Sequence, residues 1–243
     1  MNLDVWCYTT SGGRDINEDS SAWEQNGDSA CFILGDGLGG HRGGKLASDF
    51  VTVNMLEAWR SQPALSIDRS VWLEEKARTV NASLLERQKA EHNQMKSTLV
   101  CLTLDDRKAT WVHAGDSRLY YLHNGELRRL TADHSVTYRK YLSGEISLDE
   151  INFDEDRSAL LNMMGTIERC HPESGVLEEM LVPGDSFLLC SDGFWEYIYD
   201  TEILVDWLKA GNAQEWGRLL LLRVMDRLRP GSDNLTVMTV LVE

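Results

Sequence analysis

Residues 30–49 of this 243-residue chain read ACFILGDGLGGHRGGKLASD, an apolar run followed by a glycine-rich loop that contains Asp36. The apolar run is typical of a buried strand, and the glycines let backbone groups and ligands approach the turn closely. A carboxylate next to a bare glycine carbonyl offers the oxygen ligands that Mg²⁺ and Mn²⁺ prefer. Asp36 and Gly37 are therefore the first candidates for a divalent-cation site.

The same loop overlaps two nucleotide-binding patterns. It fits the dinucleotide spacing G-x-G-x-x-G from Gly35 to Gly40, and it nearly fits the phosphate loop G-x-x-x-x-G-K-[ST] from Gly39 to Leu46. Asp36 argues against both, because a carboxylate is repelled where backbone amides should cradle an anion. Leu46 also stands where a phosphate loop needs a hydroxyl group, and the chain lacks the alternating βαβ order of a parallel sheet.

Four other aspartates stand at the start or the end of apolar runs, namely Asp19, Asp116, Asp192 and Asp233. Any one of them alone is typical of an ordinary turn. Together with Asp36, in this arrangement at strand ends, they predict a metal site built from several carboxylates. The formal net charge of -15 argues against nucleic acid as a partner, because phosphate backbones are bound by basic surfaces.

Short runs rich in β-branched and aromatic residues are predicted to be the strands that carry these aspartates. They cover residues 3–9, 30–34, 98–104, 110–114, 118–123, 186–190 and 235–242. Asn124-Gly125 predicts a tight hairpin, so that 98–130 forms an antiparallel meander. Helical periodicity covers 44–61, 70–92 and 201–228, with a break near Gly211. This order predicts an α+β fold in a single domain over residues 1–243.

Residues 135–165 are more polar and acidic than the rest of the chain. We expect this segment to lie outside the core, either as a flap over the site or as a plain surface excursion. The five cysteines show no Cys-x-x-Cys spacing, which indicates free thiols in a reducing compartment. No stretch has the features of a signal peptide or the length of a membrane span. We therefore expect a cytoplasmic protein that makes no membrane contact.

A series of short motifs runs in order along nearly the whole chain. They are RDINED (14–19), DGLGGH (36–41), ST (97–98), HAGDSR (113–118), LTADHS (130–135), SDG (191–193) and DN (233–234). Each motif is weak alone, whereas the ordered set is specific. In this set the chain resembles the PPM-type metal-dependent protein phosphatases, also called the PP2C family, in their compact bacterial form.

The resemblance implies a central β-sandwich of two antiparallel sheets flanked by helices, in the layer order αββα. It also implies two Mn²⁺ or Mg²⁺ ions at one end of the sandwich, with a possible third. In the family's pattern the aspartate at Asp36 bridges both ions and the carbonyl of Gly37 binds one of them. The remaining ligands would be Asp192 and Asp233 for one ion, Asp19 for the other, and Asp116 for the third.

The resemblance further implies that Arg14 binds the substrate phosphate, which suits the planar fork of a guanidinium group. Glu18, acting mainly through water, and Asn234 would support the ligands. The leaving serine or threonine oxygen needs a proton, and an imidazole near neutral pKa can give it. His41 is the candidate for this role, and the alternative is that it stabilises the loop. Asn162 stands where family members often carry an arginine, so any contact made by that arginine is in doubt here.

The predicted reaction is hydrolysis of phosphoserine or phosphothreonine in proteins, opposing a Ser/Thr kinase in bacterial signalling. The expected partners are a phosphoprotein substrate, and a cognate kinase or its forkhead-associated target, with the enzyme acting as a monomer. A phosphoprotein-binding pseudophosphatase without turnover is the alternative function. Cys101 and Arg107 have the C-x5-R spacing of cysteine-dependent phosphatases, but Asp105 and Asp106 between them would repel phosphate and raise the thiol pKa.

Overall fold

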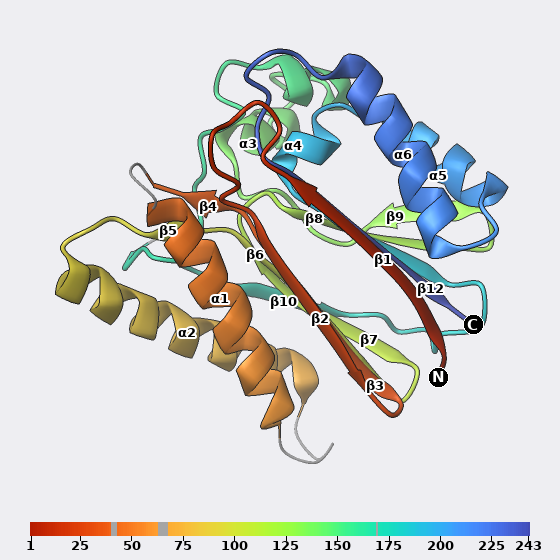
Figure 1. Ribbon diagram of the computed structural model, residues 1–243, viewed down its shortest axis with the longest axis horizontal. Helices are drawn as coiled ribbons and strands as arrows, with labels where there is room; N and C mark the ends of the chain where they lie inside the picture. The colour runs from red at the N-terminus through yellow and green to blue at the C-terminus, as the bar shows by residue number, and fades with distance from the viewer. Residues whose placement is uncertain (40–42, 63–67, 169) are drawn as a thin grey trace.

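The computed structural model describes residues 1–39, 43–62, 68–168 and 170–243. Two five-stranded antiparallel sheets form the centre of the molecule, and helices cover both outer sides (Figure 1). The first sheet has the order β1-β12-β11-β8-β9, with strands β1 (Leu3–Thr10), β8 (Arg118–His123), β9 (Glu126–Arg129), β11 (Ser186–Cys190) and β12 (Leu235–Val242). The second has the order β10-β7-β6-β3-β2, with strands β2 (Ser20–Asn26), β3 (Ser29–Gly35), β6 (Leu99–Asp105), β7 (Lys108–Ala114) and β10 (Glu173–Val176). A short pair, β4 (Gly37–Leu38) and β5 (Lys96–Ser97), lies beside it.

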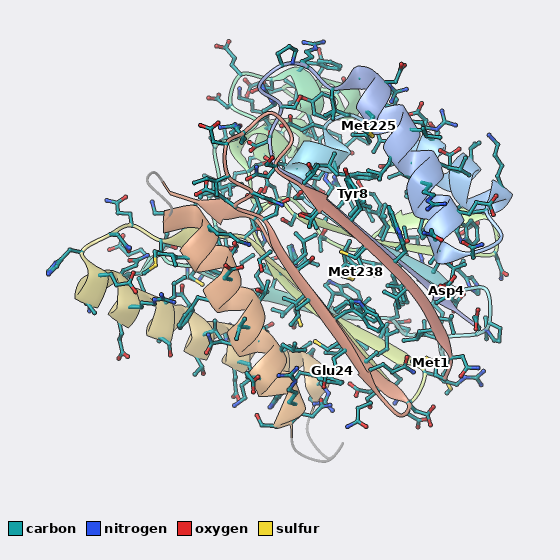
Figure 2. All side chains as sticks on the ribbon, viewed as in Figure 1. Met1, Asp4, Tyr8, Glu24, Met225 and Met238 are labelled. Carbon is teal, nitrogen blue, oxygen red and sulfur yellow. The ribbon has the colours of Figure 1, made fainter. Side chains whose placement is uncertain are left out.

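The core follows from the two-residue alternation of the strands. Phe32 and Leu102 of the second sheet and Phe187 and Met238 of the first face one another in an apolar layer between the sheets. Figure 2 shows Met238 in this central position. This layer makes the two sheets a sandwich and holds their strand ends together.

The outer faces of the two sheets are covered by helices. Helices α1 (Gly43–Arg60) and α2 (Arg69–Glu91) pack on the second sheet, where Val51 and Leu84 join Ile33 in one apolar cluster. Helices α5 (Asp200–Lys209) and α6 (Ala213–Arg227) pack on the first sheet, where Trp216 joins Leu188. The result is the four-layer αββα arrangement visible in Figure 1.

Residues 135–165 form α3 (Val136–Leu142) and a 3-10 turn, η1 (Leu148–Phe153). The segment is not wholly outside the core as expected, because Ile151 is buried beside α5 and α6, and Met164 is buried beside α2. An isolated bridge from Ser135 to Leu160 closes the segment on itself, and a second, from Ser97 to Met164, joins its end to β5. The polar composition concealed these apolar anchors.

The predicted α+β sandwich is confirmed, and the seven predicted strands and three helical regions agree with the structure to within two residues at their ends. The prediction missed β2 and β10. Both are edge strands of the second sheet, so they carry little of the apolar alternation by which a strand is recognised. Among the residues that the structure describes, no helix is long and apolar enough to cross a membrane.

Candidate metal centre

Antiparallel pairing brings the predicted aspartates to one end of the sandwich. Asp36 follows the last residue of β3, and Asp19 precedes the first residue of its partner β2, because Ser20 pairs with Gly35. Asp192 follows β11 and Asp233 precedes β12 in the same way, because Cys190 pairs with Val237. Asp116 lies in the turn that joins the two sheets through β7 and β8.

A cleft of about 270 Å³ opens at this end. Its lining combines acidic, basic and glycine residues from six segments of the chain: Arg14, Glu18, Asp36, Gly37, Leu38, Gly39, Asp116, Ser158, Leu160, Asp192 and Asp233. The structure thus places seven of the predicted site residues in one cleft. His41 lies outside the described residues, so its role as proton donor stays a prediction.

Asp36 is held at the centre by its backbone. Its N–H donates to Oγ1 of Thr98 (2.9 Å), and the N–H of Thr98 donates back to the carbonyl of Asp36 (2.8 Å). Burial, followed by repulsion from Asp192, Asp19 and other carboxylates, raises the pKa of Asp36 well above its usual range. Cations bound among these carboxylates would relieve this repulsion.

Asp19 lies beside this cleft and is only 2% exposed. Its Oδ2 accepts hydrogen bonds from Oγ of Ser191 (2.8 Å) and from Oγ1 of Thr236 (2.7 Å). These two hydroxyl groups were not predicted from the sequence. Thr236 stands 217 positions further along the chain, so only the position of Ser191 next to Asp192 could have drawn attention to it.

Two further carboxylate oxygens indicate which kind of ligand this end of the molecule can bind. Oδ1 of Asp19 and Oδ1 of Asp192 are buried and have no hydrogen-bond partner among the residues that the structure describes. Burial raises the pKa of Asp19 to about 7 and that of Asp192 to about 6. A buried polar atom without a partner costs free energy, and a buried carboxylate costs more. An all-oxygen donor set with orphaned oxygens fits a hard divalent cation.

Gly37 lies where the segments that carry Gly44 and Glu18 pass close to the chain. A Cβ atom at this position would lie 2.2 Å from the carbonyl oxygen of Gly44 and 2.7 Å from that of Glu18. Only glycine therefore fits, and the backbone at Gly37 stays open to a ligand.

Asn234 connects the cleft to the loop before β2. Its Oδ1 accepts from the N–H of Glu18 (2.7 Å), and its Nδ2 donates to the carbonyls of Ser11 (3.0 Å) and Ile16 (2.9 Å). The same loop carries Arg14, whose Nη2 lies 2.9 Å from Oδ2 of Asp233. The Arg14 side chain is 55% exposed, so it is free to turn toward a ligand in the cleft.

A buried ion pair between Arg118 and Asp133 supports the loop that carries Asp116. Arg118 donates to both carboxylate oxygens of Asp133, with its Nη2 at 2.6 Å, and its guanidinium group stacks 3.6 Å from the ring centroid of Trp195. The indole N–H of Trp195 donates to the carbonyl of Asp116 (2.9 Å). Burial and the neighbouring Asp192 and Asp133 raise the pKa of Asp116.

Two other candidate groups lie away from the cleft lining. Cys101 is buried in the core on β6, where its Sγ lies 3.7 Å from that of Cys31, so it has no route to a substrate phosphate. His113 stacks on His134 with 4.6 Å between ring centroids. Burial and then His134 lower the pKa of His113 to about 4, so its ring is neutral at pH 7.

Comparison with known proteins agrees with this geometry. The family model described as protein phosphatase 2C matches residues 12–215. A serine/threonine phosphatase of Listeria welshimeri is 30% identical over 233 residues, which cover 93% of this chain and 90% of the relative. The crystal structure of the serine/threonine phosphatase Stp1 from Staphylococcus aureus superposes with a TM-score of 0.87 at 28% identity, covering 100% of this chain and 96% of that one.

The catalytic domain of the serine/threonine phosphatase PstP, solved with two manganese ions, is also similar. It superposes with a TM-score of 0.82 at 27% identity and covers 98% of this chain and 97% of that one. The family model spans most of the sequence, and the solved structures span all of its layers. The chain therefore belongs to the protein phosphatase 2C family and is a metal-dependent serine/threonine protein phosphatase of the bacterial type.

Proposed function

We propose that this phosphatase binds two Mn²⁺ or Mg²⁺ ions in the described cleft, and that Asp116 adds a site for a third. The proposed ligands are Asp19, Asp36, the carbonyl of Gly37, Asp116, Asp192 and Asp233. The observation that carries the proposal is the pair of buried carboxylate oxygens, on Asp19 and Asp192, that have no partner within residues 1–39, 43–62, 68–168 and 170–243. The two manganese ions in the PstP structure support the number of ions.

Bound ions would neutralise the phosphate monoester and lower the pKa of the water that attacks it. The chain's own residues bind and orient the substrate. Arg14 holds Asp233 through a single N–O contact, so it can release this carboxylate and offer two parallel N–H groups to the phosphate. Ser191 and Thr236 orient Asp19 so that its other oxygen faces the ligand side. His41 would protonate the leaving serine or threonine oxygen.

The substrate is a protein phosphorylated on serine or threonine. A kinase that phosphorylates serine or threonine, or its forkhead-associated target, would be the functional counterpart of this enzyme. The enzyme would act as a cytoplasmic monomer. The pseudophosphatase alternative requires a defective ligand set, and each proposed ligand is in place in the sequence.

The deciding experiment is hydrolysis of p-nitrophenyl phosphate and of a phosphothreonine peptide with Mn²⁺ or with EDTA. Activity that appears with Mn²⁺ and disappears with EDTA supports the proposal. Asp36→Asn and Asp192→Asn should each lower kcat by about 100-fold or more, because a ligand of the centre is lost. The exposed Asp226→Asn is the matched control and should have normal activity. Near-normal activity of Asp36→Asn would contradict the ligand assignment.

Arg14→Ala should mainly raise KM for the phosphopeptide, because the mutation removes phosphate binding rather than a metal ligand. An unchanged KM would mean that another cation holds the phosphate. Peptide binding without turnover in any metal would favour the pseudophosphatase.

A further inference from the structure

A second cavity of about 540 Å³ lies next to the metal cleft. It is lined by the end of η1, the segment after helix α4 (Asp192–Trp195) and the loop between α6 and β12. Its residues are Phe153, Arg157, Glu196, Tyr197, Ile198, Tyr199, Arg227, Arg229, Pro230, Gly231 and Ser232. None of these residues is a proposed metal ligand. We call this space the side pocket.

The side pocket and the metal cleft are adjacent, because consecutive residues of the same segments line one or the other. Ser232 lines the side pocket and the next residue, Asp233, lines the metal cleft. Likewise, Arg157 lines the side pocket and Ser158 lines the metal cleft. The N–H of Gly13 donates to the carbonyl of Ser232 (2.9 Å), which brings the loop of Arg14 against this wall. The side pocket therefore lies beside the place where Arg14 would hold a substrate phosphate.

Two of the three arginines in the side pocket are engaged within the protein. Arg157 contacts Glu196 (Nε to Oε1, 3.2 Å). Arg227 binds Glu202 through two contacts of 2.6 Å. The third, Arg229, is exposed, and its guanidinium group has no carboxylate within ion-pair distance among the residues that the structure describes. In a chain of net charge -15, this leaves a local positive site beside the catalytic cleft.

The backbone and the aromatic side chains of the side pocket are suited to a ligand of peptide size. Oγ of Ser232 accepts from the N–H of Arg229 (2.9 Å) and donates to its carbonyl (2.6 Å), which fixes the turn. Phe153 is 71% exposed and Tyr199 is 46% exposed, so both offer apolar surface to an incoming chain.

We propose that the side pocket binds the part of the phosphoprotein next to the phosphorylated residue, and that Arg229 pairs with an acidic side chain there. A basic side chain placed next to Arg229 would be repelled, because Arg229 is the arginine of this pocket that has no ion-pair partner among the described residues. The inference rests on the proposed function, because it takes the metal cleft as the place of the phosphate. It adds a preference for substrates in which an acidic residue lies near the phosphorylated serine or threonine.

The test compares phosphothreonine peptides that carry Glu or Gln at each position from -4 to +4, with p-nitrophenyl phosphate as a substrate too small to reach the side pocket. For the wild type with Mn²⁺ we expect kcat/KM to be about fivefold higher with Glu at one or two of these positions, because an exposed ion pair contributes modestly. Arg229→Gln should abolish this preference and leave hydrolysis of p-nitrophenyl phosphate unchanged.

Arg218→Gln is the matched control, because Arg218 is exposed on α6 and, within the described residues, has no carboxylate partner. It should keep the preference for Glu. Phe153→Ala should raise KM for every peptide without changing the p-nitrophenyl phosphate reaction. The inference is overturned if the wild type prefers Glu at no position, or if Arg229→Gln keeps the preference.

Peptide binding measured by fluorescence anisotropy separates this inference from the proposed function. If no metal supports turnover, the proposed function is wrong. A Glu preference in binding that depends on Arg229 would still support the side pocket as the peptide site, and its absence would overturn it.

Discussion

At the scale of single residues, the centre depends on hydroxyl groups as much as on carboxylates. Asp19 has one oxygen occupied by Ser191 and Thr236, and this leaves its other oxygen as the only one available to a cation. The aspartates could be predicted from the sequence because they recur at strand ends. Their hydroxyl partners could not, because 172 and 217 residues separate Ser191 and Thr236 from Asp19 and only the folded sheets bring them together.

Thr236→Val tests this arrangement, because valine keeps the shape of threonine and removes the donor to Asp19. We expect the Mn²⁺ concentration for half-maximal activity to rise about 10-fold or more, as is typical when a residue that orients a metal ligand is lost. Stability should fall by about 1 kcal/mol through the lost hydrogen bond.

Thr103→Val is the control for this mutant, because it also removes a buried hydroxyl donor, to the carbonyl of Thr110, but far from the cleft. Its free energy of unfolding, measured in urea, should fall by a similar amount, and it should keep the wild-type Mn²⁺ requirement. If both mutants need the same Mn²⁺ concentration as the wild type, Thr236 does not position Asp19.

At the scale of elements, the segment 135–165 is joined to the loop of Asp116 through a histidine. Nδ1 of His134 accepts from the N–H of Gly115 (3.2 Å) and from Nδ2 of Asn162 (3.0 Å), and the N–H of His134 donates to the carbonyl of Gly115 (3.0 Å). The other ring nitrogen, Nε2, lies 3.4 Å from Oε1 of Glu173.

Asn162 completes this connection. It also donates to the carbonyl of His171 (2.7 Å) and accepts from its N–H (2.9 Å). The sequence prediction noted only that Asn162 differs from the family's usual arginine. The structure gives it a set of contacts within the chain, which explains why a short amide side chain stands there.

Asn162→Ala should therefore lower the free energy of unfolding by about 1–3 kcal/mol, because the mutation leaves buried partners unsatisfied. It should also raise the Mn²⁺ concentration needed for full activity, because the turn of Asp116 loses support. Urea unfolding and Mn²⁺ titration of activity measure the two effects. The control is Asn54→Ala, which removes one hydrogen bond to the carbonyl of Phe50 within α1. It should change neither the free energy of unfolding nor the Mn²⁺ requirement by a comparable amount.

At the scale of the whole molecule, the sandwich brings carboxylates together at the cost of their mutual repulsion. Strand alternation and motif order were enough to predict the layers, because most strands are buried and strongly apolar. The edge strands and the apolar anchors of segment 135–165 were missed, because their neighbours in space rather than their own composition decide their structure.

The metal-free protein should lose stability as the pH rises from about 4 to about 8. The pKa of Asp19 is raised to about 7 and that of Asp192 to about 6, so the folded state binds more protons than the unfolded state over this range. The expected fall in the free energy of unfolding is on the order of a few kcal/mol, because one pKa unit corresponds to about 1.4 kcal/mol. Urea unfolding in EDTA at pH 5 and pH 8 measures it.

Saturating Mn²⁺ should reverse this dependence, because cations bind the deprotonated carboxylates of the folded state. Metal-free protein that is equally stable at pH 5 and pH 8 would mean that the aspartates are not buried together as described.

The position of β12 has a consequence for the growing chain on the ribosome. This strand follows all the other described strands in the sequence, yet it lies between β1 and β11 in the first sheet (Figure 1). Until residues 235–242 have emerged, β1 has no neighbour and β11 has one open edge, and Thr236 has not reached Asp19. Open strand edges favour contacts with other chains, so a nascent chain has a strong need for chaperones during this interval. Folding of the first sheet and assembly of the catalytic centre are thus delayed until residues 235–242 have been synthesised.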